Sequence, residues 1–181
     1  VQVYGNVAGT PGPAGPQGPA GPQGAAAPVC TEFSTGITAN SYPLGITTGA
    51  DGNIWFTEVS GNMVGRITPY GVVAEFSTGI TANSYPFAIT AGPDGNLWFT
   101  EETGNRIGRI TPTGVVTEFS AGITASSNPR GITTGPDGNL WFSEYSGNRI
   151  GRITPTGVIT EFSTGITASS YPVGIIAARD G

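Results

Sequence analysis

The amino-acid sequence predicts an all-β protein made of β-propeller blades, each with four antiparallel strands. An Asp-Gly dipeptide recurs about every 43 residues, and this period is typical of propeller blades. The recurring positions are Asp51, Asp94, Asp137 and Asp180. Each complete repeat contains four short apolar runs separated by Gly, Pro and Asn turn signals, as a four-stranded blade requires. The second run carries adjacent Trp and Phe residues, whose rings would point to opposite faces of a sheet covered on both sides.

The N-terminal part has a different composition. Glycine occupies every third position from Gly9 to Gly24, and proline fills most of the positions that follow a glycine. This spacing is collagen-like, because only glycine fits the crowded axis of three polyproline-type chains. A stiff Pro/Gly linker is the alternative. We therefore predict a collagen-like stalk or linker at residues 1–29, followed by propeller repeats at residues 30–181.

Turn chemistry divides the repeats into strands. In the second blade we expect strands at 86–90, 96–101, 106–111 and 115–120, because proline presets φ and glycine accepts a positive φ in the turns between them. The same division places blades at about 43–78, 86–121 and 129–164. A fourth strand at 31–34 and a partial blade at 172–181, with a first strand and its turn, bring the total to about three and a half blades. We expect the chain to be part of a longer propeller, or to be completed by another chain, because unpaired edges are avoided.

Composition limits the classes of partner. The net charge is −5, the seven cationic residues are all arginine, and histidine is absent. An acidic chain without a basic stripe argues against a nucleic-acid partner. The single cysteine, Cys30, excludes an internal disulfide framework; it could remain a free thiol or cross-link chains in an oxidising compartment. No apolar run approaches the roughly 20 residues needed to span a bilayer.

The second strands end in glutamates that are candidate metal ligands. These are Glu58, Glu101 and Glu144. A ring of carboxylates could hold a hard cation such as Mg²⁺ or Ca²⁺. The alternative is that the repeat retains a solvated turn residue at this position.

Positions at which the repeats differ are candidates for ligand or partner contacts. The residue after the strand-opening proline varies, and so does the residue after the second-strand glutamate. The two sets are Leu44, Phe87, Arg130 and Val173, and Val59, Glu102 and Tyr145. In a propeller, the loops that join strand four to strand one and strand two to strand three open on the same face. We hypothesise that this face binds a ligand or partner, with Arg130, Glu102 and Tyr145 as polar contacts. Neutral drift at exposed sites is the alternative.

The third and fourth strands carry recurring charges. If the Pro-Thr pair formed a two-residue hairpin loop, Arg109 would lie opposite Val116 and diagonal to Glu118 on one face. This register predicts a cross-strand ion pair between Arg109 and Glu118, worth less than about 1 kcal/mol if exposed.

The repeat GPDGNLWFTE…GNRIGRITPTG resembles the streptogramin B lyase (virginiamycin B lyase) family of seven-bladed propellers, from about residue 30 to the end. The resemblance implies elimination chemistry that opens cyclic depsipeptide antibiotics, with a bound magnesium ion. It also implies a histidine base directly after a strand-opening proline. Here those positions hold Leu44, Phe87, Arg130 and Val173, so no catalytic residue is assigned.

Two functions follow as expectations. The first is a non-catalytic extracellular propeller on a collagen-like stalk, acting in adhesion, recognition or assembly of a surface structure. It would self-associate, as a trimer through the stalk or by edge-strand pairing, and would bind a glycan or a protein. The second is a metal-dependent lyase of the streptogramin type whose catalytic blades lie outside this sequence. The missing histidine favours the first.

Overall fold

The computed structural model describes residues 31–178, and it folds them into three antiparallel sheets of four strands without a helix. The first sheet contains β1 (Pro43–Thr48), β2 (Ile54–Glu58), β3 (Met63–Ile67) and β4 (Val73–Phe76). The second contains β5 (Pro86–Ala91), β6 (Leu97–Glu101), β7 (Arg106–Ile110) and β8 (Val116–Phe119). The third contains β9 (Pro129–Thr134), β10 (Leu140–Glu144), β11 (Arg149–Ile153) and β12 (Ile159–Phe162). Strands adjacent in sequence are adjacent in each sheet, which confirms the predicted propeller blades.

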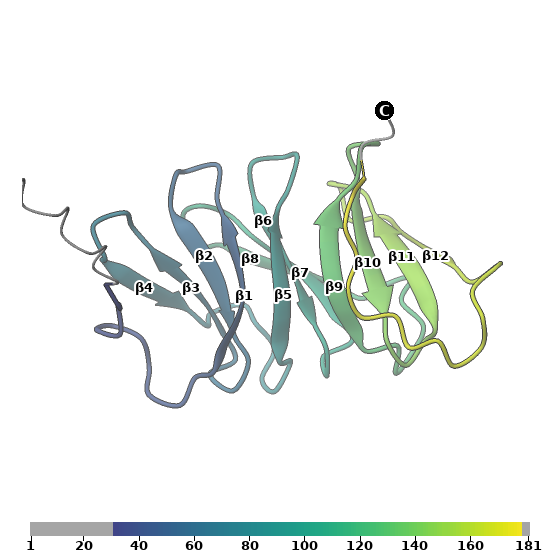
Figure 1. Cartoon of the computed structure of the whole chain (residues 1–181), viewed down its shortest axis with the longest axis horizontal. Coiled ribbons are helices and arrows are strands. Elements are labelled where there is room, and N and C mark those ends of the chain that lie inside the picture. The colour runs from purple at the N-terminus through teal and green to yellow at the C-terminus, as the bar shows by residue number, and fades with distance from the viewer. Residues whose placement is uncertain (1–30, 179–181) are drawn as a thin grey trace, which may run out of the picture. The chain divides into compact units, whose positions relative to one another are not determined.

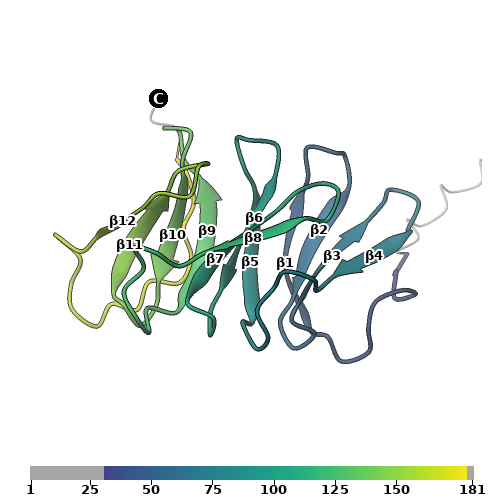
Figure 2. The same ribbon diagram turned by 180° about the vertical axis from the view of Figure 1, so that it is seen from behind.

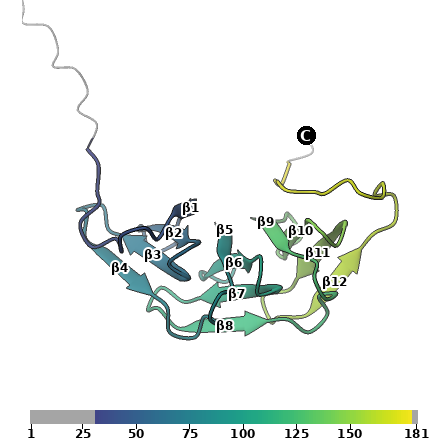
Figure 3. The same cartoon turned by 90° about the horizontal axis from the view of Figure 1, so that it is seen from below.

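The three sheets stand side by side (Figure 1, and from behind in Figure 2). Seen from below, the three sheets follow an arc (Figure 3). The first strands β1, β5 and β9 lie on the inner side of the arc, and the fourth strands β4, β8 and β12 lie on the outer side. The short turns between first and second strands lie at the upper edge of Figure 1, and the long connections between sheets lie at the lower edge.

The Pro-Asp-Gly turn is tied to the core tryptophan of its own blade. Asp94 accepts hydrogen bonds from the Asn96 backbone N–H at 3.2 Å and from Trp98 Nε1 at 3.0 Å. Gly95 has a φ of 76°, which glycine adopts at little cost. The other two blades repeat these contacts with Asp51 and Asp137. The turn therefore orients the tryptophan as well as reversing the chain.

The hairpin between the third and fourth strands corrects one prediction. The Thr111 N–H bonds the Val115 carbonyl, so the loop has three residues, and Arg109 pairs with Thr117 rather than with Val116. A shift of one residue moves every side chain of a strand to the other face. The predicted ion pair between Arg109 and Glu118 is therefore wrong.

Both charged side chains have other partners instead. Arg109 Nη1 donates to the Pro155 carbonyl of the next blade at 3.2 Å, and its guanidinium carbon lies 5.6 Å from the centre of the Trp98 ring. Glu118 accepts hydrogen bonds from the Thr81 N–H at 2.5 Å and the Thr81 hydroxyl at 2.6 Å. Its Oε2 also lies 3.6 Å from Arg106 Nε. The arginine joins the second blade to the third, and the glutamate holds the loop that connects the first blade to the second.

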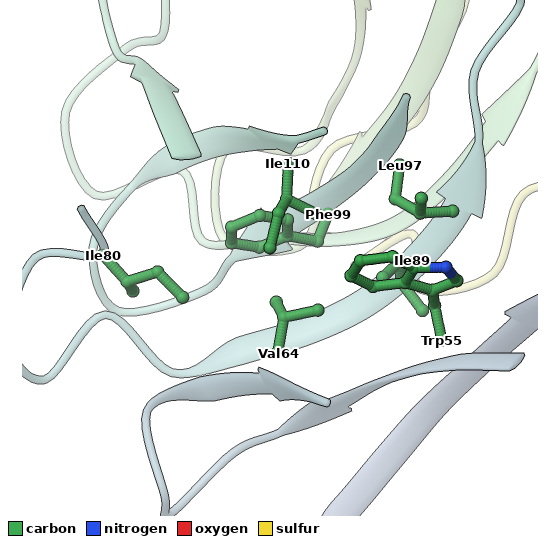
Figure 4. Packing of buried hydrophobic residues seen from close by; sticks show 7 residues of the cluster. All are labelled: Trp55, Val64, Ile80, Ile89, Leu97, Phe99 and Ile110. Carbon is green, nitrogen blue, oxygen red and sulfur yellow. The ribbon is translucent and has the colours of Figure 1, made fainter. Parts of the chain in front are cut away.

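The hydrophobic core lies between the sheets. Trp55 and Val64 of the first sheet face Leu97, Phe99 and Ile110 of the second (Figure 4). A second cluster joins the second and third sheets and contains Trp98. Trp98 and Phe99 are both fully buried and belong to different clusters, which confirms that the paired aromatic residues of a blade pack on opposite faces.

The expected strands at the two ends of the repeats are not formed. Neither 31–34 nor 172–178 is a strand, because neither segment has a neighbouring strand with which to build a ladder. The Val173 carbonyl nevertheless accepts a hydrogen bond from Ser143 Oγ at 2.6 Å, so this segment follows the path of a first strand. The predicted collagen-like stalk at 1–29 and the last three residues of the partial blade lie outside the described residues. Within the described part, no helix is long and apolar enough to cross a membrane.

Candidate functional site

The two variable sets of loops meet on one side of the sheets. The Glu102 N–H donates to the Tyr85 carbonyl at 3.1 Å, and the Thr103 N–H donates to the Ser84 carbonyl at 3.1 Å. These bonds join the loop after β6 to the connection before β5. The loop after β10 makes the same contact, from the Tyr145 N–H to the Asn128 carbonyl at 3.1 Å. The variable positions therefore share a face.

Glu102, Arg130 and Tyr145, the three predicted contact residues, lie together on this face. Arg130 is the second residue of β9, and its Nε and Nη2 donate hydrogen bonds to Oε1 of Glu102 at 2.9 and 2.7 Å. The guanidinium carbon lies 3.6 Å from the centre of the Tyr145 ring, within the range of a cation–π contact. The ion pair joins the second blade to the third.

Two further aromatic residues extend this group. Arg130 lies 5.5 Å from the centre of the Phe87 ring, and the Tyr171 ring lies 5.1 Å from the Tyr145 ring. Phe87, Arg130, Tyr145 and Tyr171 thus lie next to one another across the face, with the two tyrosine rings tilted by 40°. We call these four residues and Glu102 the Arg130 cluster. The ion pair and the stacking hold the arginine in one orientation, since its planar guanidinium satisfies both contacts at once.

The sequence did not assign Phe87 and Tyr171 to this group. Phe87 is one of the variable post-proline residues, whereas Tyr171 belongs to a set that recurs two residues before them. A signal for that set is visible in the sequence: tyrosine recurs at Tyr42, Tyr85 and Tyr171, and Asn128 takes its place ahead of Arg130. The corresponding first-blade residues, Leu44 and Val59, are apolar, so within the described residues this cluster forms only where the second and third blades meet.

The recurring tyrosines have an unusual backbone conformation. Tyr42, Tyr85 and Tyr171 have φ values of 55°, 57° and 46°. A positive φ is rare for a residue with a bulky side chain, and it persists only where the surrounding structure enforces it. All three side chains are exposed on the face of the Arg130 cluster. The connections between blades therefore present tyrosine rings to solvent from a backbone conformation that the surrounding structure enforces.

The predicted metal ligands lie elsewhere. Glu58, Glu101 and Glu144 are each fully buried, each in its own sheet, and no hydrogen bond of ordinary geometry reaches their carboxyl oxygens. They are therefore not the solvated turn residues that the sequence allowed as an alternative. In residues 31–178, no three His, Cys, Asp or Glu side chains are grouped closely enough to hold a metal ion. The structure does not bring the three glutamates into a shared site, and the Mg²⁺ or Ca²⁺ site stays a prediction.

Each buried glutamate lies near a second carboxylate. Burial raises the pKa of Glu101 to about 8; the Glu118 carboxylate adds to the rise, while the Ser84 hydroxyl and Arg106 oppose it. Burial likewise raises the pKa of Glu144 to about 7. The pKa of Glu58 is also raised, chiefly by burial. Protonation removes the charge that burial opposes, so these groups are suited to holding a proton near neutral pH.

The described chain is similar in structure to solved lyases. Virginiamycin B lyase from Staphylococcus aureus matches with a TM-score of 0.78 and 47% sequence identity, over 83% of this chain and 50% of that chain. A catalytically inactive histidine-to-alanine variant of the same enzyme, solved with quinupristin, matches with a TM-score of 0.76 and 49% identity, over 80% and 48% of the two chains. A further streptogramin B lyase structure gives a TM-score of 0.78 and 44% identity, over 83% and 49%.

The chain spans about half the length of these solved lyases. A comparison with curated protein sequences gave no match. The family model described as the virginiamycin B lyase family matches residues 25–181, which include all three sheets. The chain therefore belongs to the virginiamycin B lyase family.

Proposed function

We propose that this chain is a non-catalytic recognition propeller whose Arg130 cluster contacts the ligand or partner. The observation that carries the proposal is the contact between Arg130 and Glu102. Arg130 follows a strand-opening proline, the position at which the family resemblance places the catalytic histidine. Its guanidinium is bound to a carboxylate, and an arginine stays protonated, so it cannot accept a proton as a general base.

The composition supports the same proposal. The sequence contains no histidine, whereas the related lyase is described as inactive when one histidine is replaced by alanine. The variable face also has features of a contact surface: its cluster joins two blades through an ion pair, and Tyr85 and Tyr171 are exposed beside it. Conformational restriction lowers the entropy cost of binding.

The cellular setting is part of the proposal and rests on the sequence pattern. A collagen-like stalk at residues 1–29 would carry the propeller outside the cell, in adhesion, recognition or assembly of a surface structure. Trimerisation through that stalk would place three copies of the cluster near one another and raise avidity without a new contact.

A lyase whose catalytic blades lie outside this sequence is the second candidate. It is favoured by sequence identity of 44–49% to three lyase structures, of which this chain covers only about half. In that case the Mg²⁺ ion and the histidine would come from blades that this sequence does not contain.

Quinupristin turnover by the product of the complete reading frame separates the two candidates, because the second candidate places its catalytic blades outside this sequence. That protein is incubated with quinupristin, with and without Mg²⁺, and the products are separated by reversed-phase chromatography, because ring opening by elimination leaves the mass unchanged. We expect the antibiotic to remain cyclic. Ring opening above the buffer control contradicts the proposal.

Recognition is tested on an array that carries glycans and purified surface proteins. We expect the labelled chain to bind a subset of spots, and we expect Arg130→Ala with Tyr145→Ala to abolish that binding. Tyr70→Ala is the matched control, because Tyr70 is 93% exposed in the turn between β3 and β4, among the turns opposite the variable face. Binding that is retained by the double variant would contradict the proposal.

A further inference from the structure

We infer that the Arg130 cluster binds a neutral oligosaccharide through two adjacent hydroxyl groups of a sugar ring. This inference rests on the recognition function proposed above and specifies the class of ligand.

Arg130 uses two nitrogens to bind a single carboxylate oxygen. Nε and Nη2 both donate to Oε1 of Glu102. Within residues 31–178, Oε2 of Glu102 and Nη1 of Arg130 make no hydrogen bond, and the two side chains are 19% and 25% exposed. A hydrogen-bond acceptor and a donor are therefore available side by side, both on charged groups whose orientation is already set.

Adjacent hydroxyls of a pyranose match this arrangement. One hydroxyl donates to Oε2 of Glu102, and its neighbour accepts a hydrogen bond from Nη1 of Arg130. Hydrogen bonds with an ionised partner are about twice as strong as neutral ones. Since the ion pair holds both side chains, the ligand does not have to order them.

The surrounding rings suit the other surface of a sugar. A pyranose has a face of C–H groups that packs against an aromatic ring, while its hydroxyls point outward. Tyr171 is 51% exposed, and its ring packs at a tilt of 40° against Tyr145, which lies against Arg130. On the neighbouring blade Tyr85 is 42% exposed. Tyrosine combines an apolar ring with a polar tip, so it serves both parts of a sugar.

Charge argues for a neutral ligand. An anionic group that approached Arg130 would be repelled by Glu102, and a cationic group that approached Glu102 would be repelled by Arg130. A hydroxyl can satisfy either residue without that penalty. Exposed tyrosines on both sides of the ion pair, Tyr85 and Tyr171, provide room for more than one sugar, so we infer an oligosaccharide rather than a monosaccharide.

The experiment is titration calorimetry with defined polysaccharides. The probes are two neutral polymers, dextran and galactomannan, and one anionic polymer, polygalacturonate. We expect a neutral polymer to bind, and we expect the same polymer to lose binding after periodate oxidation and borohydride reduction, because periodate cleaves bonds between adjacent hydroxyl-bearing carbons. Binding to polygalacturonate alone, or binding that survives periodate, overturns the inference.

Variants locate the site on the chain. Glu102→Gln and Tyr145→Leu should each weaken binding about tenfold or more. The first removes the charged acceptor, and the second removes the ring against which Arg130 and Tyr171 pack. Tyr70→Ala should leave the affinity unchanged. A reversed pair, Glu102→Arg with Arg130→Glu, retains an ion pair and so guards against simple loss of the fold; it should also weaken binding, because donor and acceptor exchange places. Unchanged affinity in Tyr145→Leu contradicts the inference.

The array described above separates this inference from the function on which it rests. If no neutral polysaccharide binds but Arg130→Ala with Tyr145→Ala still abolishes binding to an arrayed protein, the oligosaccharide is wrong and the recognition function stands. If the chain binds nothing on the array and no polymer in solution, both are wrong.

Discussion

The Thr100 hydroxyl donates a hydrogen bond to the backbone carbonyl of Arg130 at 2.6 Å. The Thr100 hydroxyl oxygen also accepts a hydrogen bond from the Ala88 N–H at 3.1 Å. Thr100 is fully buried on β6, so one side chain joins the first two strands of its own blade and the first strand of the next. Thr57 and Ser143 make the same pair of contacts in the other blades. A hydroxyl that recurs in each blade therefore fixes the backbone position of Arg130, the central residue of the Arg130 cluster.

Thr100→Val should lower the free energy of unfolding by about 1–3 kcal/mol, because the half-buried Ala88 N–H and Arg130 carbonyl lose their bonds to the hydroxyl. Urea unfolding followed by tryptophan fluorescence measures the loss. Thr160→Val is the control, since Thr160 is exposed on β12, and it should change stability by less than about 0.5 kcal/mol. Equal effects of the two substitutions would show that the hydroxyl does not join the blades.

Gly108→Ala should destabilise the fold by about 1–3 kcal/mol through overpacking. A Cβ at Gly108 would overlap the ring of Phe99, which is fully buried between the first two sheets and cannot move aside. Gly174→Ala is the matched control, because a Cβ there meets no atom within 4 Å. Thermal unfolding of both variants checks the prediction, and an unchanged melting temperature for Gly108→Ala contradicts it.

Asn105 should show separate costs for its backbone conformation and its hydrogen bonds. Its φ is 53°, and its side chain donates to the Thr124 carbonyl at 3.0 Å and accepts from the Ser127 N–H at 2.8 Å. Both variants lose the hydrogen bonds, but Asn105→Gly also removes the Cβ from the left-handed region, whereas Asn105→Ala retains it. We expect alanine to be less stable than glycine by about 1 kcal/mol, measured by urea unfolding. A glycine variant no more stable than the alanine variant would exclude backbone strain at this site.

Stability should decrease as the pH rises from about 5 to 8. The folded-state pKa values of Glu101 and Glu144 are raised to about 8 and about 7, above the ordinary value of 4.5. A raised pKa means that the folded state holds a proton which the unfolded state releases. Its stabilisation is complete below pH 4.5 and is lost progressively up to the folded-state pKa, at about 1.4 kcal/mol per pH unit for each group.

Glu101→Gln should flatten this dependence, since an amide does not titrate. Unfolding free energies of the wild type and the variant, measured at pH 5, 6, 7 and 8, provide the test. Parallel curves for wild type and Glu101→Gln between pH 5 and 8 would contradict the assignment.

In the acid range a different loss of stability is expected. Asn139 and Trp141 donate hydrogen bonds to Asp137 and lower its pKa to about 2, so this stabilisation is lost as the pH falls below 3.8.

Much of the fold could be predicted from the sequence, because the information is local and repeated. Proline, asparagine and glycine restrict the backbone within a few residues, so they mark the turns between strands. All twelve strands of the three complete blades were expected. The strand bounds predicted for the second blade agree with the structure to within one residue. The adjacent tryptophan and phenylalanine predicted a sheet that is covered on both faces. The variable positions Glu102, Arg130 and Tyr145 were also visible, because a repeat provides its own reference for what has changed.

Only the tertiary structure decided which side chains meet. A loop of three residues rather than two turns Arg109 and Glu118 to opposite faces, and a single glycine with a φ of 92°, Gly114, makes that difference. The burial of Glu101 arises from packing around the end of β6, and the contact between Arg130 and Glu102 arises from the packing of the second blade beside the third. Sequence determines local conformation through short-range sterics, whereas burial and contacts between blades depend on how separate sheets pack, and no single repeat contains that information.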